Sequence, residues 1–200
     1  MSDQRTIDVY NARVDAYVET VAHEPDNETI AAFIAALPAK GRVLDIGCAT
    51  ANAAAKMRDA GLQIVAVDPS EGMIAKAKQL HDINVIPGSF DDIPALGKFD
   101  GIWANFCLLH ARREDMPRHL GDIHAALTPG GLFHIALKLG DGDARDRIDR
   151  YYTYYAEDEL TALLENAGFG LVDKVYGEGP GLEGSISKWI AIRARTEPRG

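Results

Sequence analysis

Cysteine is scarce in this sequence, and long hydrophobic runs are missing. The two cysteines, Cys48 and Cys107, fit neither a metal-ligand pattern nor a disulfide pattern, and no His/Asp/Glu cluster shows ligand spacing. No apolar run approaches the roughly 20 residues that a membrane-spanning helix needs. The N-terminal stretch MSDQRTIDVY lacks the charged-then-apolar layout of a signal peptide. We therefore expect a cytoplasmic protein that binds no metal and no membrane.

Positive charge is also in short supply, because 21 Lys and Arg residues face 30 Asp and Glu residues, for a formal net charge of −9. Binding the phosphate backbone of a nucleic acid needs a basic face, so the charge argues against such a partner. Small neutral or cationic ligands are compatible with it. The 200 residues show no internal repeat, and their number fits one domain with a full hydrophobic core.

The most informative stretch present is residues 43–57, VLDIGCATANAAAKM. It has the order of an apolar strand, a tight turn and an Ala-rich helix, which opens the ligand site of doubly wound α/β domains. The next strand ends at Asp68, 21 residues after Gly47. An acid at a spacing of about 20 residues commonly meets ribose hydroxyls. Where such a loop carries three glycines, this one has Gly47, Ala49 and Ala51.

Strand-like and helix-like segments alternate after this point. Such alternation predicts a parallel sheet with helices on both faces. Right-handed crossovers then bring the carboxyl ends of the strands to one edge. Two helices, at 5–21 and about 30–37, precede the first strand. The expected strands are 43–46, 63–67, 83–86, 99–104 and 131–137, and the expected helices are about 51–60, 70–80, 114–127 and 156–167, with a turn or short helix at 89–96.

The end of the chain breaks the alternation. Segments 171–176 and 188–194 both look like strands, and eleven residues that include GEGPGLEGS separate them. This connection is too short for a crossover helix, so we expect the last two strands to be antiparallel. A plain dinucleotide-binding domain does not end in such a hairpin.

Five motifs in this order and spacing carry a resemblance to a known family. They are VLDIGCATA, IVAVDPSEGM, GSFDDIP, FDGIWANFCLLH and LTPGGLF. From about Asp26 to Arg195 the chain resembles the class I S-adenosylmethionine-dependent methyltransferases. The resemblance implies a doubly wound, seven-stranded, mostly parallel sheet with a C-terminal antiparallel hairpin and helices on both faces. It divides the single domain into an N-terminal helical cap (1–40), an α/β core (41–195) and a frayed tail (196–200).

The resemblance also implies which residues bind S-adenosylmethionine, whose product is S-adenosylhomocysteine. The loop after the first strand would pass under the methionine portion, and Asp68 would accept hydrogen bonds from both ribose hydroxyls. Many members have an Asp in place of Ser89, so recognition of the adenine amino group here would be weaker or would use Asp91. The implied cofactor-binding residues are Asp45, Gly47, Cys48, Ala49, Asp68, Pro69, Met73, Ser89, Phe90, Ala104 and Asn105.

The acceptor of the methyl group is less defined. His110 follows the fourth strand and is a candidate general base, with a structural histidine as the alternative. The segment 138–155, KLGDGDARDRIDRYYTYY, is either an acceptor pocket for a carboxylate or an aromatic ring, or a solvated loop of paired charges. The first helix is either a lid, with Tyr10, Arg13 and Tyr17 over the site, or plain packing. The candidate substrate-binding residues are Tyr10, Tyr17, Arg150, Tyr151, Tyr152 and Tyr154.

The sequence therefore predicts methyl transfer from S-adenosylmethionine to a small molecule by direct in-line displacement. A degenerate, non-catalytic binding protein is one alternative, because of the two alanines in the loop. A nicotinamide-dependent oxidoreductase is another, although Asn52 takes the place of its third glycine and the next glycine is Gly61. The oligomeric state, monomer or homodimer, and the methylated atom, O, N, C or S, stay open.

Overall fold

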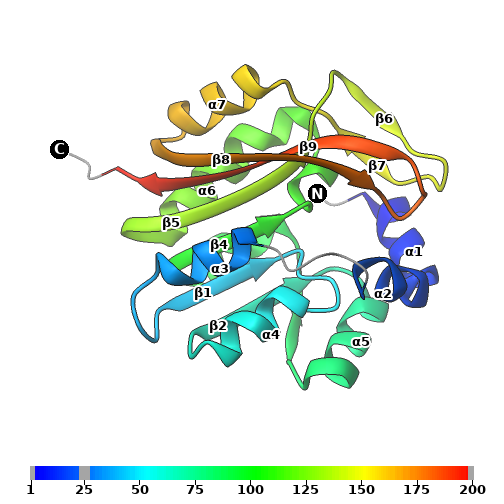
Figure 1. The fold of residues 1–200 in the computed structure, drawn as a ribbon, viewed down its shortest axis with the longest axis horizontal. Coiled ribbons are helices and arrows are strands. Elements are labelled where there is room, and N and C mark those ends of the chain that lie inside the picture. The colour runs from blue at the N-terminus through cyan, green and yellow to red at the C-terminus, as the bar shows by residue number, and fades with distance from the viewer. Residues whose placement is uncertain (1–2, 23–27, 198–200) are drawn as a thin grey trace.

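The computed structural model describes residues 3–22 and 28–197, which form one central sheet with helices on both sides (Figure 1). The seven strands lie in the order β3-β2-β1-β4-β5-β9-β8. A separate two-stranded sheet pairs β6 with β7. The strands of the large sheet are β1 (Arg42–Ile46), β2 (Gln63–Asp68), β3 (Val85–Pro87), β4 (Phe99–Asn105), β5 (Leu127–Lys138), β8 (Phe169–Pro180) and β9 (Ile186–Thr196), and the small sheet holds β6 (Asp143–Arg145) and β7 (Tyr151–Thr153).

The first five strands are parallel, and β9 is antiparallel to both β5 and β8. This confirms the predicted fold class and the predicted terminal hairpin. The hairpin strands are longer than expected, because Gly177, Gly179 and Pro180 continue β8 instead of starting the loop. A side chain at Gly177 would place its Cβ 2.2 Å from the Trp189 ring, so the glycine leaves room for that indole across the strand pair.

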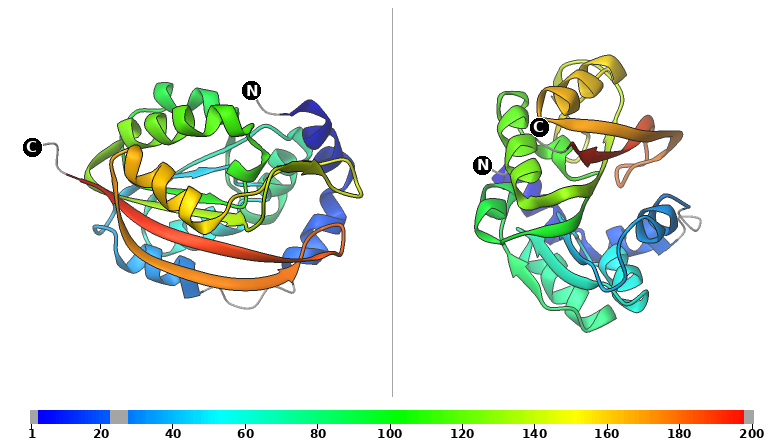
Figure 2. Two further views of the ribbon diagram at one scale, coloured as in Figure 1. Left: turned by 90° about the horizontal axis from the view of Figure 1, so that it is seen from above. Right: turned by 90° about the vertical axis from the view of Figure 1, so that its left-hand side faces the viewer.

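Helices cover both faces of this sheet, as Figure 2 shows from two further directions. Buried side chains of α3 and α4 pack on Val43 and Trp103, whereas those of α6 and α7 pack on Leu44 and Ile102. This alternation of inward positions is the pattern of strands buried on both faces. The helices are α1 (Gln4–Ala12), α2 (Val14–Ala22), α3 (Glu28–Ala35), α4 (Asn52–Asp59), α5 (Glu71–His81), α6 (Met116–Ala126) and α7 (Glu157–Asn166), with short 3-10 turns at Phe90–Ala95, Leu108–His110 and Arg113–Asp115.

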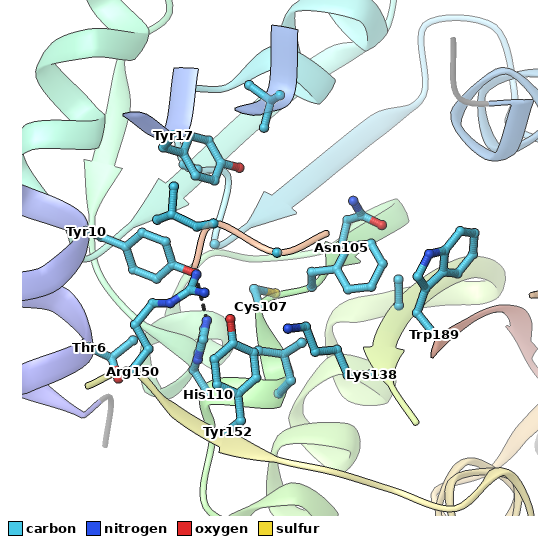
Figure 3. A pocket seen from close by; sticks show the side chains of 18 of the residues that line it. Thr6, Tyr10, Tyr17, Asn105, Cys107, His110, Lys138, Arg150, Tyr152 and Trp189 are labelled. Carbon is cyan, nitrogen blue, oxygen red and sulfur yellow. Dashed lines mark hydrogen bonds between the residues drawn. The ribbon is translucent and has the colours of Figure 1, made fainter. Parts of the chain in front are cut away.

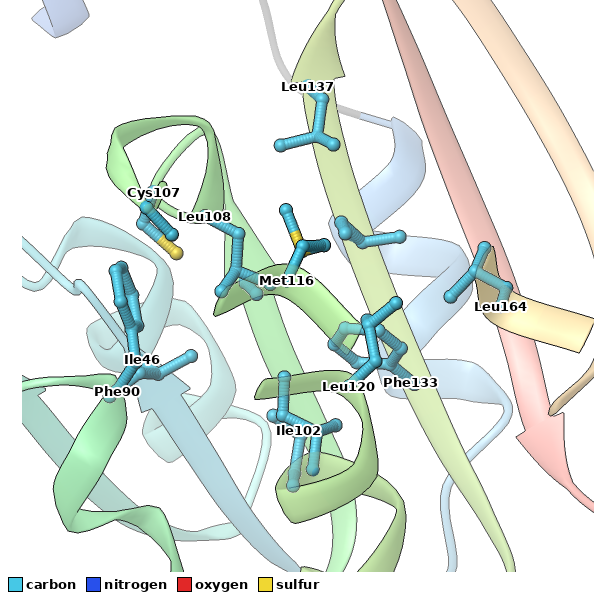
Figure 4. Close-up of a cluster of buried hydrophobic side chains, with 14 of the residues drawn as sticks. Ile46, Phe90, Ile102, Cys107, Leu108, Met116, Leu120, Phe133, Leu137 and Leu164 are labelled. Atoms are coloured by element: carbon cyan, nitrogen blue, oxygen red, sulfur yellow. The ribbon is translucent and has the colours of Figure 1, made fainter. Parts of the chain in front are cut away.

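The main core lies between β4 and β5 on one side and α6 and α7 on the other (Figure 4). Each fully buried Leu, Ile or Phe side chain there contributes about 1.5–3 kcal/mol of burial free energy. The same cluster extends to Cys107 and Phe90, which belong to segments that follow strands at their carboxyl ends. Core packing therefore also holds the loops that surround the site.

The structure corrects the prediction at both ends of the chain. The expected helix 5–21 breaks at Arg13, whose φ of −125° leaves the helical range, and α1 and α2 result. In the last turn of α1, just before the break, Asn11 Oδ1 accepts hydrogen bonds from Ser70 Oγ at 2.7 Å and Gly72 N at 3.0 Å. The frayed tail was predicted to begin at residue 196, but Thr196 still belongs to β9, and its Oγ1 donates a hydrogen bond to Thr128 O at 3.0 Å.

Residues 198–200 and Asp26, where the resemblance was expected to begin, lie outside the described part of the chain. Over the described residues, no helix combines the length and the apolar character that crossing a membrane requires. The arrowheads of the parallel strands point to the side of the molecule where α1, α2 and the turn between β8 and β9 lie (Figure 1). That edge of the sheet is where a ligand site is expected in open α/β folds.

Candidate active site

A cavity of about 630 Å³ opens at this edge of the sheet (Figure 3). Its lining comes from the ends of β1, β2, β4 and β5, from α1 and α2, and from the β8–β9 hairpin. Most of the predicted cofactor residues line it, whereas Asp45, Cys48 and Ala104 lie behind the lining. The predicted cofactor residues in the lining are Gly47, Ala49, Asp68, Pro69, Met73, Ser89, Phe90 and Asn105.

The loop after β1 has a left-handed backbone at alternate residues. The φ angles are +65° at Gly47, +49° at Ala49 and +61° at Ala51. These are the three positions where a glycine-rich loop carries glycine, which adopts such angles without steric cost. Each alanine there costs roughly 1–2 kcal/mol, because its Cβ approaches the following carbonyl oxygen. The alanines therefore keep the loop shape and strain it.

Replacing Ala49 by glycine is expected to stabilise the protein by about 0.5–1 kcal/mol, since the strain removed exceeds the extra freedom of the unfolded chain. Ala51→Gly is the matched control, because its methyl group is fully buried and its removal offsets the relief. Urea denaturation of the two variants gives the comparison. A loss of stability in Ala49→Gly, equal to or larger than that in Ala51→Gly, would contradict the strain at Ala49.

Asp68 ties this loop to the start of α5. Its Oδ2 accepts a hydrogen bond from Ala49 N at 2.8 Å, and its Oδ1 accepts one from Ser70 N at 2.9 Å. Burial raises the pKa of the carboxyl to about 6, although these hydrogen bonds oppose the shift. A carboxylate oxygen accepts more than one hydrogen bond, so each oxygen keeps capacity toward the cavity that Asp68 lines. This fits the two ribose hydroxyls of S-adenosylmethionine.

Asp45 lies beneath the loop and is 2% exposed. Its Oδ2 has no hydrogen-bond partner among the described residues, while the Ala54 backbone N–H donates to the carboxyl group. Burial, with a smaller effect of the nearby Asp68, raises its pKa to about 7. A buried oxygen without a partner is costly, so Asp45 keeps unsatisfied acceptor capacity behind the loop. Because Asp45 does not line the cavity, it would act on a bound cofactor through the loop and not by direct contact.

The adenine side differs in detail from the expectation. Ser89 N donates to Asp92 Oδ2 at 2.7 Å and Ser89 Oγ accepts from Asp91 N at 3.3 Å, so Ser89 caps the Phe90–Ala95 turn. Asp91, the expected substitute for adenine recognition, binds Arg118 at 2.7 Å and does not line the cavity. Met73 is buried and is also part of the lining, so its side chain packs in the interior and contacts the cavity as well.

On the acceptor side, three predicted residues form one chain of hydrogen bonds. Arg150 Nη1 donates to Tyr10 Oη at 2.9 Å, and Tyr10 Oη lies 2.9 Å from His110 Nε2. His110 Nδ1 donates to the Tyr151 carbonyl at 2.6 Å, since a carbonyl only accepts. Burial lowers the pKa of His110 to about 4, so the ring is neutral and Nε2 accepts the Tyr10 proton. Both nitrogens of the candidate base are thus engaged.

The segment 138–155 combines the two alternatives that the sequence left open. Arg150 is 3% exposed, lines the cavity and pairs with Asp146, whose Oδ2 accepts from Nε at 2.9 Å. Arg145 instead binds Asp3 at 2.8 Å, and the exposed Arg147 faces Glu183. Of the candidate substrate residues, Tyr10, Tyr17, Arg150 and Tyr152 line the cavity and Tyr151 and Tyr154 do not; Arg13 is exposed and lies outside the lining.

Among the lining residues to which the sequence reasoning gave no role are Lys138, Phe106 and Trp189. Lys138 ends β5 as Asn105 ends β4, so its place at the carboxyl edge was a usable signal. Phe106 has a φ of +53°, and its ring meets the Trp189 ring at a centroid distance of 5.9 Å. Trp189 comes from an antiparallel strand and carried no such signal.

His134 supports the end of β4 from behind. Its ring stacks on Trp103 at a centroid distance of 3.6 Å, and Nε2 donates to Asn105 Oδ1 at 3.1 Å. Burial lowers the pKa of His134 to about 3, so the ring is neutral. The Asn105 amide is thereby fixed at the cavity wall. Within residues 3–22 and 28–197, no three His, Cys, Asp or Glu side chains gather in a way that could hold a metal ion.

Comparisons with known proteins agree with this geometry. A family model described as "Methyltransferase domain" matches residues 17–174. An uncharacterized methyltransferase of Staphylococcus carnosus is 35% identical over 138 residues, which cover 68% of this chain and 67% of that protein. An uncharacterized methyltransferase of Alkaliphilus oremlandii is 31% identical over 99 residues, which cover 48% of this chain and 45% of that protein.

Among solved structures, 1,6-didemethyltoxoflavin-N1-methyltransferase of Burkholderia thailandensis, with 1,6-didemethyltoxoflavin and S-adenosylhomocysteine bound, has a TM-score of 0.75. It is 23% identical, and the match covers 98% of this chain and 88% of that one. At this identity the likeness shows a shared fold. The family model covers most of this chain, and the Staphylococcus carnosus relative is 35% identical to it. The chain therefore belongs to the methyltransferase-domain family of class I S-adenosylmethionine-dependent enzymes.

Proposed function

We propose that this protein transfers the methyl group of S-adenosylmethionine to a small molecule by direct in-line displacement. The observation that carries the proposal is the single cavity that joins Asp68 and the loop after β1 to the tyrosines and cations of the acceptor side. Parts of α1, α2 and the β8–β9 hairpin line the same cavity, which favours a small acceptor. The Burkholderia neighbour, which holds bound 1,6-didemethyltoxoflavin, supports this acceptor class.

The side chains of this site bind and orient more than they perform chemistry. When bound, S-adenosylmethionine supplies a methyl group on a positively charged sulfur. Asp68 would hold the ribose, the Gly47–Ala49 loop the methionine portion, and Met73 with Phe90 an apolar surface for the adenine. Asn105, fixed by His134, would face the reacting groups. Orientation of two bound reactants lowers a barrier by as much as about 7–11 kcal/mol, so no elaborate catalytic group is required.

We infer that His110 acts on the reaction through Tyr10. The lone pair that a direct general base needs is already bonded to the Tyr10 hydroxyl. With Arg150 on its other side, that hydroxyl has a fixed direction at the cavity wall. His110 and Arg150 would then position Tyr10 against the acceptor. His110, the candidate general base of the sequence prediction, thereby becomes a positioning residue in the proposed mechanism.

The proposed function predicts that S-adenosylhomocysteine stabilises the protein and that NADH does not. At about 100 times its dissociation constant, a ligand that binds only the folded state adds about 2.7 kcal/mol to the free energy of unfolding. Thermal unfolding with each compound, followed by titration calorimetry with S-adenosylhomocysteine, measures this. If S-adenosylhomocysteine gives no calorimetric heat and no shift in unfolding temperature, the enzyme is rejected in favour of a degenerate binding protein. A shift with NADH alone would favour an oxidoreductase.

A further inference from the structure

One cation in the cavity lining has no carboxylate beside it. Among the described residues Lys138 takes part in no ion pair, and its closest aromatic contact is the Tyr152 ring, with Nζ 4.5 Å from the centroid. Arg150, the other permanent cation of the lining, is neutralised by the buried Asp146 at 2.8 Å. Burial and the nearby Arg150 lower the pKa of Lys138, and the carboxylates of Glu183 and Asp146, which lie beyond ion-pair distance, partly oppose this shift, so the ammonium has no direct counter-ion and a bound anion would supply one.

A second polar group lies next to this ammonium. Tyr152 is 3% exposed, yet its hydroxyl makes no hydrogen bond with any residue in the described part of the chain. Figure 3 shows the Lys138 ammonium and the Tyr152 hydroxyl both directed toward the middle of the cavity. Burial raises the pKa of Tyr152 far above its usual value, so the hydroxyl keeps its proton and can donate it. Both groups keep hydrogen atoms to donate at the cavity wall, where a ligand with two acceptor oxygens would receive them.

We propose that Lys138 and Tyr152 together bind the carboxylate of the methyl acceptor, which is a small, flat monocarboxylic acid. The assignment rests on the proposed methyltransferase function. The ammonium would bind one carboxylate oxygen as a charged donor and the phenol would donate to the other. A single ammonium without a direct counter-ion, in a lining that also holds carboxylates such as Glu178, favours a monoanion over a doubly charged phosphate group.

The cavity wall next to Lys138 and Tyr152 is the reason for proposing a flat acceptor. Phe106 and Trp189 meet edge to face at an interplanar angle of 87°, and both line the cavity. Phe106 holds a left-handed backbone with a φ of +53°, a conformation that costs a non-glycine residue free energy and that tends to occur at functional sites. The small side chains of Ala136 and Ala191 also line the cavity. Aromatic surfaces beside small residues suit a planar apolar body that ends in a charged group.

The test uses pairs of compounds that differ only in charge. The full-length protein, saturated with S-adenosylhomocysteine, is titrated with benzoate, phenylacetate and indole-3-acetate and with the amide of each. Binding is followed by ligand-observed NMR and calorimetry. At least one acid is expected to bind about tenfold or more tightly than its amide, because a charge-assisted contact is lost in the amide. Equal binding of acids and amides, or no binding of any acid, would overturn the proposal.

Two variants assign the effect to this pair. Lys138→Met removes the charge and keeps the length of the side chain, and it is expected to abolish the preference for the acid. Tyr152→Phe is expected to lower the affinity for the acid about threefold to tenfold and to leave the affinity for the amide unchanged. Lys174→Met is the control, because Lys174 lies on β8 outside the cavity lining and pairs with Glu157 at 2.9 Å. Survival of the preference in Lys138→Met would reject the assignment.

The affinity of the same variants for S-adenosylhomocysteine separates this proposal from the proposed function. Lys138→Met is expected to bind S-adenosylhomocysteine as the wild type does. A selective loss of that affinity would mean that Lys138 holds the carboxylate of the cofactor, which overturns the acceptor assignment and leaves the methyltransferase function in place. Absence of S-adenosylhomocysteine binding in the wild-type protein would instead reject the function on which the proposal rests.

Discussion

Replacing Gly47 by alanine is expected to lower the free energy of unfolding by about 2–5 kcal/mol. The φ of +65° adds about 1–2 kcal/mol of backbone strain, and the new Cβ would lie 2.4 Å from Cys107 Cβ, an overlap that costs a further 1–3 kcal/mol. A domain of this kind has only about 5–15 kcal/mol in total, so the variant loses a large share of its stability. Urea denaturation measures the loss.

Gly121→Ala is the control for this variant. A Cβ at Gly121, within α6, meets no atom within 4 Å, so alanine there is expected to be neutral or slightly stabilising. Cys107→Gly in the Gly47→Ala background removes the overlapping atom, whereas Cys107→Ala keeps it. The first double variant is expected to be more stable than the sum of its two single-variant losses predicts, which is a coupling energy. The second double variant is expected to equal that sum. A Gly47→Ala variant as stable as Gly121→Ala would show that the loop is not held as described.

Asp68→Ala is expected to reduce the affinity for S-adenosylhomocysteine about a hundredfold to ten-thousandfold. Two hydrogen bonds from the ribose hydroxyls to a charged group are worth about 1.5–3 kcal/mol each, and each 1.4 kcal/mol is a factor of ten. The loss of Asp68 also leaves Ala49 N and Ser70 N without their acceptor, which loosens the loop. Titration calorimetry of the wild type and the variant gives the ratio.

Asp91→Ala is the matched control, because this carboxylate lies outside the cavity lining and pairs with Arg118. The affinity of the wild type is also expected to depend on pH. Asp68 has a pKa of about 6 before binding, and only its ionised form offers both oxygens as charged acceptors to the ribose hydroxyls. The affinity therefore falls as the pH drops below about 6 and levels off above it. Asp68→Ala should lose this dependence, and a variant that keeps both affinity and pH dependence would mean that the ribose binds elsewhere.

Residues at the ends of parallel strands were predictable from the fold class, whereas Tyr10, Tyr17, Arg150 and Tyr152 were named only as candidates with a structural alternative beside them. Asp68 and Asn105 close β2 and β4, and the parallel topology alone brings them to one edge. Trp189 reaches the same cavity from β9, which is antiparallel to both β5 and β8, so the rule for the ends of parallel strands does not locate it. The pairing of Tyr10 with His110 joins residues 100 positions apart, and no local pattern encodes such a contact.

The two alanines of the loop show a similar limit. Their place at two of the three glycine positions was visible in the sequence, and it left a degenerate binding protein open as an alternative. The left-handed backbone at Ala49 and Ala51 was not expected, because alanine rarely adopts it and the surrounding structure imposes it. Likewise the break at Arg13 depends on contacts of α1 with α5, which the helical periodicity of residues 5–21 does not contain.

The placement of the tryptophans gives the protein an optical probe of its own site. The chain has two tryptophans. Trp103 is 2% exposed and stacked on His134 in the interior, where no ligand reaches it, whereas Trp189 lines the cavity. With excitation that tyrosine does not absorb, a change of tryptophan emission on addition of a ligand would therefore report mainly from Trp189. Occupancy of the site can be followed in real time by fluorescence, without a label and without turnover.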